Sequence, residues 1–219
     1  MPNTTIIKKY LVLFAGLFLM GLGISLITKS CLGTSPISSV PYVLCLVFPV
    51  TFGAFAFFLG VLFLLLEIMI LGSNFPKIQL LQIFVGLLLG IFIDLGMQIL
   101  VFVQPSLYTS RILILLSGCV VLALGVYLEV SSKTFIYPGD AIVKIIADKT
   151  GRKFGNIKIA FDTSLCCTAG IISYSVFGSL KGLGEGTIIS ALLVGYIITI
   201  ISTVFVYFNG GKCTGLFRV

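Results

Sequence analysis

Two pairs of ionisable residues recur at helical spacing inside an otherwise apolar chain. Asp140 and Lys144 are four residues apart, and so are Lys158 and Asp162, so within a helix the members of each pair share one face. An ionisable side chain in a membrane helix costs at least about 2.5–3.5 kcal/mol, so it usually faces a cavity or a partner. Such residues can bind a polar solute, and an acidic one can also carry a proton or a cation.

Asp94 is a further candidate, because no basic residue lies within helical reach of it. Its carboxylate either titrates or binds a substrate cation, or it accepts hydrogen bonds from a neighbouring helix as a structural contact. Glu67 and Glu129 fall near the ends of apolar runs, where solvation is cheap. We expect both of them to have structural roles only.

The elements that position these residues must be membrane helices. The chain has 219 residues, of which 58% are hydrophobic and 10% charged, with a mean hydropathy of +1.22. Soluble domains carry about 25% charged residues. The apolar runs are continuous rather than alternating, which excludes a transmembrane β-barrel.

Apolar runs of nearly bilayer-spanning length and two shorter apolar stretches are expected to be helical. Each short stretch opens near a proline, as the first turns of helices often do. At 1.5 Å per residue, a helix over residues 138–149 is only about 18 Å long, too short for a hydrocarbon core of about 30 Å. The long runs cover residues 10–28, 52–72, 78–103, 112–130, 154–176 and 187–208, and the short stretches cover 35–49 and 138–149.

The two halves of the chain match each other at an offset of 102 residues. Pro36 meets Pro138, Ser38 meets Asp140, and Gly53 meets Gly155; further on, an offset of 105 aligns residues 87–90 with 192–195. We therefore predict an all-α polytopic transmembrane helical bundle built from two internal repeats, residues 1–104 and 105–219. Each repeat has three long helices plus one short proline-led half-helix or re-entrant segment, and together they form one membrane domain.

The number of membrane crossings decides how the two repeats are related. If the short segments do not span, each half crosses three times and the halves are inverted; if they span, the repeats are parallel. The distribution of Lys and Arg fits both arrangements, and length favours six crossings. The helix at 138–149 either lines an aqueous pocket with its stripe of Asp140, Lys144 and Asp148, or lies in the membrane interface. We expect a multi-pass protein of the cell membrane with a cytoplasmic N-terminus.

Several classes of function are disfavoured. The chain has no histidine, its six cysteines lack metal-ligand spacing, and no Gly-x-Ser-x-Gly motif occurs, so we expect no metal, no cofactor and no enzymatic activity. The net charge of +7 comes from lysines and arginines in short loops, so no nucleic-acid partner is expected. The glycine-rich loop at 182–187 lacks the Lys-Ser/Thr pair of a phosphate loop and is expected to be a flexible turn capped by Thr187.

The chain resembles the YczE/YitT-like family of small bacterial integral membrane proteins. The resemblance is carried by LGISLITKSCLGTSPISSV (22–40), TFGAF (51–55) and VGLLLGIFIDLG (85–96), whose Asp94 matches an acidic position of the group. Lys158 and Asp162 match a basic–acidic pair, and residues 184–187 resemble a Gly-x-Gly-Thr turn. Residues 137–140 stand where the group has a Gly-Pro-Arg-Asp-Gly-like turn, with Gly139 in place of the arginine. The resemblance implies a transporter-like architecture and no particular reaction.

Taken together, these features predict a transporter or permease for a small polar solute, ion-coupled or facilitative. Interrupted segments at matching positions of two halves are the best sequence indication of a midplane site. The apolar segments carry three acids against two lysines, which favours an organic cation or a zwitterion as the solute. The acids are Asp94, Asp140 and Asp162, and the lysines are Lys144 and Lys158. The expected partners are the lipid bilayer and this solute, with a homodimer left open, and the alternative is a non-transporting scaffold or accessory subunit. The candidate substrate-binding residues are Ser35, Ser38, Ser39, Asp94, Tyr137, Asp140, Lys144, Lys158 and Asp162.

Overall fold

The computed structural model describes residues 3–152 and 154–208, and in this part of the chain all regular secondary structure is helical, with no strand. The predicted all-α class is therefore confirmed. The helices are α1 (Asn3–Lys29), α2 (Pro36–Val47), α3 (Phe52–Leu71), α4 (Gln82–Ile99), α5 (Tyr108–Ser131), α6 (Pro138–Thr150), α7 (Phe154–Phe177) and α8 (Glu185–Phe208), with 3-10 turns at Gly72–Asn74 and Lys77–Leu81.

Five helical segments of the described part are long and apolar enough to cross a membrane, as expected of a membrane helical bundle. They are Ile7–Lys29, Phe52–Asn74, Lys77–Ile99, Tyr108–Ser131 and Asn156–Phe177. Helix α8 has 24 residues, but its side chains are described only as far as Ile201. Large apolar side chains such as Leu113, Ile171 and Leu192 are more than 60% exposed, which is the surface that lipid requires.

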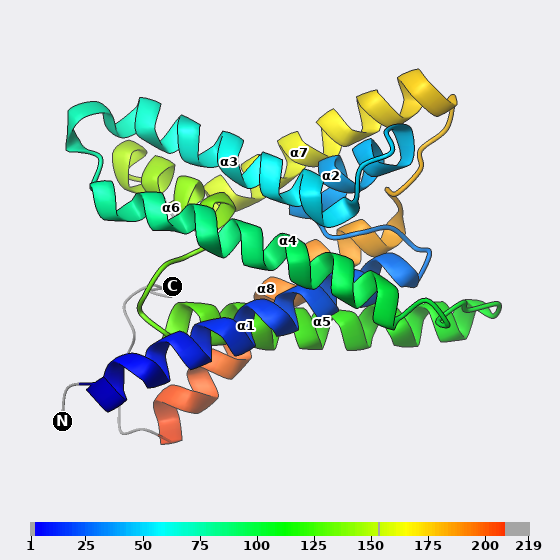
Figure 1. The fold of residues 1–219 in the computed structure, drawn as a ribbon. Helices are drawn as coiled ribbons and strands as arrows, with labels where there is room; N and C mark the ends of the chain where they lie inside the picture. The colour runs from blue at the N-terminus through cyan, green and yellow to red at the C-terminus, as the bar shows by residue number, and fades with distance from the viewer. Residues whose placement is uncertain (1–2, 153, 209–219) are drawn as a thin grey trace.

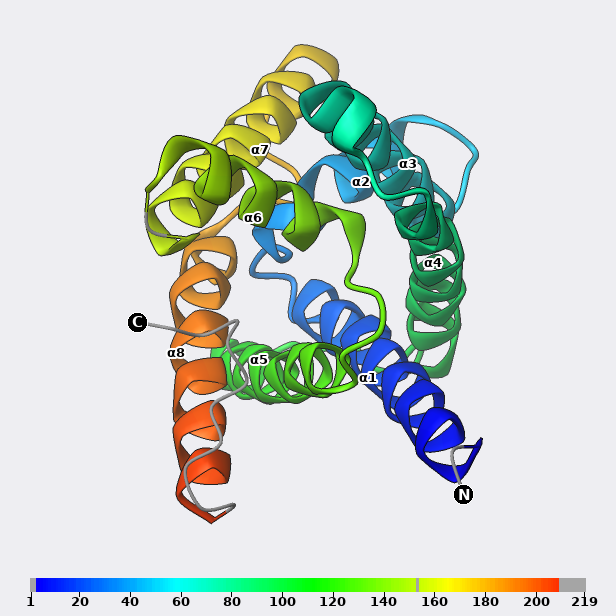
Figure 2. The ribbon, with the colours of Figure 1, turned by 90° about the vertical axis from the view of Figure 1, so that its left-hand side faces the viewer.

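The long helices surround the two short ones. Helix α1 packs along α5 and α4, α3 packs along α4, and α8 packs along α5; α2 and α6 each contact both α3 and α7. Figure 2, which views the bundle from one end, shows α2 and α6 lying between the long helices. Helix α6 buries Pro138, Gly139, Ile142 and Val143, which favours the interpretation of a packed helix over one lying in the membrane interface.

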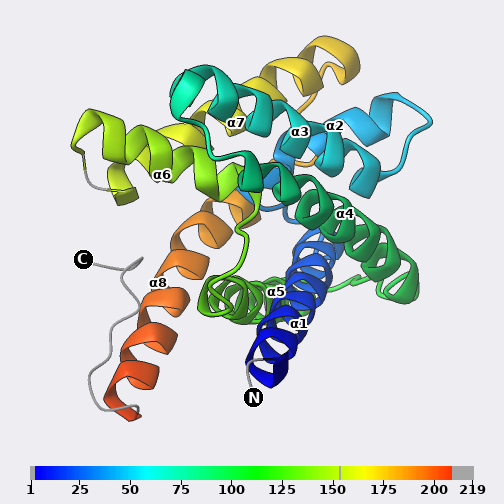
Figure 3. The ribbon, with the colours of Figure 1, turned by 60° about the vertical axis from the view of Figure 1, so that its left-hand side comes forward.

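The two short helices meet at their N-terminal ends. Each begins with a proline at its first turn, after Ser35 in α2 and after Tyr137 in α6. The side chain of Ile37 occupies the space that a Cβ atom on Gly139 would need. Figures 1 and 3 show α2 and α6 running from this meeting point toward opposite ends of the bundle. At 12 and 13 residues, each is about 18–20 Å long and spans only part of a bilayer.

Helices α1 and α5 cross in close contact because glycines line their interface. A Cβ atom on Gly23 would lie 2.5 Å from the backbone nitrogen of Leu122, and one on Gly125 would lie 2.6 Å from that of Met20. As residue numbers rise along α1, the facing numbers fall along α5, so the two helices cross antiparallel. Small residues of this kind allow backbones to approach within a membrane.

We predict that Gly23→Ala destabilises the protein by about 1–3 kcal/mol, since the methyl group must displace the backbone of α5. Gly195→Ala in α8 is the matched control, because a Cβ atom there has no neighbour within 4 Å. It should be neutral or stabilising by up to about 1 kcal/mol, since alanine favours a helix more than glycine does. Thermal unfolding in detergent measures both, and equal midpoints for the two variants would contradict the close crossing.

Candidate functional site

Three of the predicted residues form one ion-paired cluster beside the meeting point of the short helices. Lys158 Nζ lies 2.8 Å from Asp140 Oδ1 and 3.2 Å from Asp162 Oδ1. The exposed fraction of the side chain is 27% for Lys158, 23% for Asp140 and 16% for Asp162. They are therefore partly exposed, yet largely enclosed by the bundle. We call these three residues the Lys158 cluster.

The cluster is assembled by two helices. Helix α7 places Lys158 and Asp162 one turn apart, which confirms their predicted pairing. Asp140 lies in the first turn of α6, where the positive end of the helix dipole favours a carboxylate. The N-cap of α6 is Tyr137, and the Asp140 carboxylate accepts from Lys158, so Asp140 pairs with α7 rather than capping its own helix.

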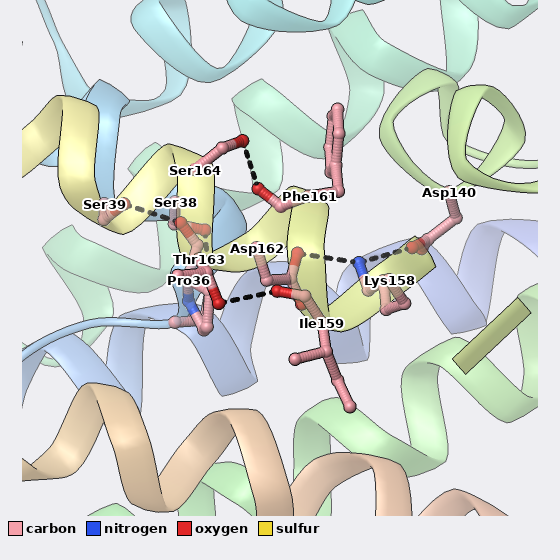
Figure 4. Close-up of polar contacts among 11 residues, drawn as sticks. Pro36, Ser38, Ser39, Asp140, Lys158, Ile159, Phe161, Asp162, Thr163 and Ser164 are labelled. Atoms are coloured by element: carbon pink, nitrogen blue, oxygen red, sulfur yellow. Dashed lines mark hydrogen bonds and ion pairs between the residues drawn. The ribbon is translucent and has the colours of Figure 1, made fainter. Parts of the chain in front are cut away.

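The predicted serines lie in the first turn of α2, on the other side of Asp162. Figure 4 shows Ser38 and Ser39 to one side of Asp162, with Lys158 and Asp140 to the other. Ser35 Oγ donates to Ser38 Oγ at 2.9 Å, and Ser39 Oγ donates to the carbonyl of Pro36 at 2.6 Å. All three serines are buried, so their hydroxyls shape the N-terminal turn of α2 next to the cluster.

The charges around the meeting point nearly cancel. Each helix N-terminus carries the equivalent of about half a positive charge, and Lys158 adds a full one. These oppose the carboxylates of Asp140 and Asp162. A site of this kind suits a solute that is neutral or that carries both signs of charge more than it suits a simple cation or anion.

Tyr137 connects the start of α6 to two other helices. Its backbone N–H donates to Glu129 Oε1 of α5 at 2.8 Å, and its hydroxyl donates to the carbonyl of Ala56 in α3 at 3.2 Å. These two bonds hold the break between α5 and α6 in place.

Asp94 and Lys144 are not part of the cluster. Asp94 Oδ1 accepts from the backbone N–H of Gly53 at 2.7 Å, at the N-terminus of α3. This contact matches the structural interpretation of Asp94 that the sequence left open. Lys144 lies one turn beyond Asp140 on α6, but Asp140 pairs with Lys158 instead, and Lys144 forms none of the ion pairs in the described part of the chain.

The expectation that Glu67 and Glu129 are solvated is wrong. Glu67 is 0% exposed and Glu129 is 1% exposed. Both lie near helix ends, but those ends are enclosed by neighbouring helices rather than by water. One signal in the sequence was informative: at the offset of 102, Glu129 meets Ile27 and Glu67 meets Ala169. At that offset an apolar residue therefore stands opposite each buried acid.

The loop before α8 is fixed to the loop before α2. The backbone N–H of Thr34 donates to the carbonyl of Gly182 at 3.1 Å, and that of Gly186 donates to the carbonyl of Leu32 at 2.8 Å. Gly33 has a φ of +126° and lies against Thr187, so only glycine suits this position. The turn that was expected to be flexible is thus held by hydrogen bonds. Helix α8 begins at Glu185, and Thr187 Oγ1, within its first turn, accepts from the backbone N–H of Gly184 at 3.4 Å.

A cavity of about 680 Å³ opens beside these two loops. It lies at the end of the bundle toward which α2 runs, because Tyr42 and Leu46 of α2 line it. Its polar lining includes Thr28, Tyr42, Lys181 and Glu185.

The fold and the apolar exterior define a small integral membrane protein with a helical bundle. The family of unknown function DUF6198 matches residues 7–203, so the chain belongs to that family. It is 29% identical over 196 residues to the uncharacterized membrane protein YczE of Bacillus subtilis (strain 168), covering 88% of this chain and 85% of that protein. This similarity also supports the YczE-like resemblance. No solved structure matches the chain.

We predict that Lys158→Met destabilises the protein by about 2 kcal/mol, less than the 3–5 kcal/mol typical of a fully buried pair, because the cluster is partly exposed. The loss arises because Asp140 and Asp162 are left without a counter-charge. Lys144→Met is the matched control and should change stability by less than about 0.5 kcal/mol.

Adding Asp140→Asn and Asp162→Asn to Lys158→Met should recover most of the loss, since no unpaired charge remains. Thermal unfolding in detergent measures each variant. A triple variant as unstable as Lys158→Met alone would show that the charges are not what holds these helices together.

Proposed function

We propose that the protein is a permease for a small polar solute, with its site at the Lys158 cluster. The observation that carries the proposal is that the N-terminal ends of α2 and α6 meet beside that cluster. In transporters, discontinuous helices place their N-termini at a midplane site, because an interrupted backbone is tolerated only where protein or a wet cavity satisfies it. No enzymatic step and no cofactor are part of this proposal.

Internal duplication of the two halves is a second part of the proposal, and matching contacts support it. A Cβ atom on Gly16 would lie 2.8 Å from the backbone nitrogen of Glu129, and one on Gly118 would lie 2.8 Å from that of Ile27. At the offset of 102 residues Gly16 corresponds to Gly118 and Ile27 corresponds to Glu129, so each contact is the counterpart of the other. Reciprocal contacts of this kind are the mark of a two-fold relationship between the partners.

The loops that follow α1 and α5 repeat in the same way. Ser30 Oγ donates to the carbonyl of Ile27, and Ser132 Oγ donates to the carbonyl of Glu129, both at 2.6 Å. Cys31 and Lys133, one residue further on, are the non-glycine residues with positive φ in the described chain, at 59° and 52°. Both pairs are separated by 102 residues.

An antiparallel crossing of equivalent helices implies inverted halves. If α1 and α5 are equivalent and both span the membrane, their antiparallel contact requires a two-fold axis in the membrane plane. We therefore propose six crossings with α2 and α6 as half-helices, in the cell membrane with the N-terminus in the cytoplasm. Eight crossings with parallel repeats do not fit this contact.

The solute class follows from the charge balance at the meeting point. Two helix ends and Lys158 against two carboxylates leave little net charge, so we propose a zwitterion or a neutral polar solute. Three acids in the apolar segments favoured an organic cation, but one of them, Asp94, accepts a hydrogen bond from Gly53 of α3. A simple organic cation is therefore less favoured. The cavity beside Tyr42 and Lys181 is the proposed entrance from one side.

The alternative is a non-transporting scaffold or accessory subunit, for which locally paired acids are expected. Asp94 bonded to Gly53, and the Lys158 cluster paired within itself, fit that alternative as well. The partial exposure of the cluster and the meeting of the two helix ends favour the permease. Measurement of solute flux separates the two.

We predict that purified protein in proteoliposomes takes up at least one member of a panel of labelled proteinogenic amino acids, which are zwitterions. Asp162→Asn should reduce this uptake at least tenfold, because the carboxylate that holds Lys158 is lost. Asp148→Asn, on the exposed side of α6, and Asp94→Asn, which keeps an acceptor for Gly53, should retain it.

Uptake of none of the panel, or equal uptake by Asp162→Asn and Asp148→Asn, would contradict the proposed site. Uptake by wild type that is lost only in Asp94→Asn would move the site to α4.

A further inference from the structure

Glu129 is a buried carboxyl with one oxygen bonded and one oxygen free. It is 1% exposed, and its Oε1 accepts the backbone N–H of Tyr137 at 2.8 Å. Its Oε2 meets no hydrogen-bond donor in the described structure. A buried carboxylate oxygen without a donor or counter-ion is costly, whereas the same oxygen can carry a proton at little cost.

Packing alone does not require an acid at this position. Ile27 is the residue of α1 that corresponds to Glu129, and it is 0% exposed in the reciprocal contact with Gly118. An apolar side chain therefore fills this place in one half of the chain. The helix crossing therefore does not explain why position 129 carries a carboxyl group.

The surroundings connect Glu129 to the Lys158 cluster. Tyr137 donates its backbone N–H to Glu129, and Asp140, which pairs with Lys158, lies in the first helical turn after Tyr137. Helix α1 presents Gly16 to its backbone, and the titratable residues Lys8, Lys9 and Tyr10 of α1 are exposed. Helix α8 also packs on α5, and its Glu185 and Tyr196 are exposed.

We propose that Glu129 is a proton-binding site that couples solute movement at the Lys158 cluster to a proton gradient. In one state Oε2 carries the proton. When Lys158 is released from Asp140 by a bound solute, Glu129 gives this proton to water or to the Asp140 carboxylate and becomes a carboxylate itself. Lys158 and the Tyr137 N–H then stabilise the new negative charge, and uptake of a proton from water restores the first state.

The proton site is tested without any solute by infrared difference spectroscopy of the full chain in lipid vesicles. Raising the pH should remove a carboxylic-acid C=O band in the wild type. In Glu129→Gln, which keeps the acceptor for Tyr137, the component of this band change that comes from Glu129 should be absent. Glu67 is equally buried and can contribute a band of its own, but it lies on α3. Glu67→Gln is therefore the matched control, and it should retain the component that Glu129→Gln loses.

Superimposable difference spectra of the wild type and Glu129→Gln would overturn the proposal, as would loss of the band in Glu67→Gln alone. Glu129→Ile places at position 129 the residue type found at position 27, and it serves as a second variant in case Glu129→Gln does not fold. If neither Gln nor Ile at position 129 gives a folded protein, Glu129 is a structural residue and the proposal fails.

The coupling rests on the proposed function and is tested with a pH dye enclosed in proteoliposomes, using the same amino-acid panel as solute. Wild type should acidify the lumen on solute addition. Glu129→Gln should exchange labelled for unlabelled solute without acidification, and acidification equal to the wild type would overturn the coupling. If the wild type moves none of the panel, the proposed function fails, while the infrared result still decides the proton site.

Discussion

The lack of water inside a bilayer is the constraint on which this architecture depends. A helix that stops within the membrane leaves backbone N–H and C=O groups that only protein or a wet cavity can satisfy. In the proposed arrangement helices α2 and α6 both begin there, so the residues around their ends must supply polar partners. Glu129 accepts the Tyr137 backbone N–H, and Ser39 Oγ donates to the Pro36 carbonyl. Neither helix start has a side-chain cap bond, and the side chains of Asp140 and Lys158 add a polar surrounding at the start of α6.

The glycine-lined crossing of α1 and α5 holds the short helices α2 and α6 in place. Each short helix follows directly from one of the two crossing helices, through the loops after Lys29 and Ser131. A close, antiparallel crossing therefore fixes where both short helices start. The same crossing supports the proposed duplication, because its contacts and the two following loops repeat at an offset of 102 residues.

The sequence predicted local features well and contacts between distant helices poorly. Pro36 and Pro138 marked the starts of α2 and α6, and the four-residue spacing of Lys158 and Asp162 predicted their ion pair, because both signals lie within one helix. The contacts between Asp94 and Gly53 and between Lys158 and Asp140 join different helices. The spacing of residues along the sequence does not predict such contacts. Burial of Glu129 was missed because closeness to a helix end does not reveal whether other helices enclose that end.

In the proposed permease the ends of α2 and α6 border a water-accessible space within the membrane. Cys166 and Cys167 test it directly, because Cys166 lies one turn beyond Asp162 and contacts Ser39 of α2, whereas Cys167 is exposed on the outer face of α7. Two chains, each retaining one of these cysteines with the others replaced by alanine, are treated in membranes with a small water-soluble thiol reagent. We expect the reagent to modify Cys166, whereas lipid should protect Cys167. An unreactive Cys166 would show that the ends of α2 and α6 border no such space.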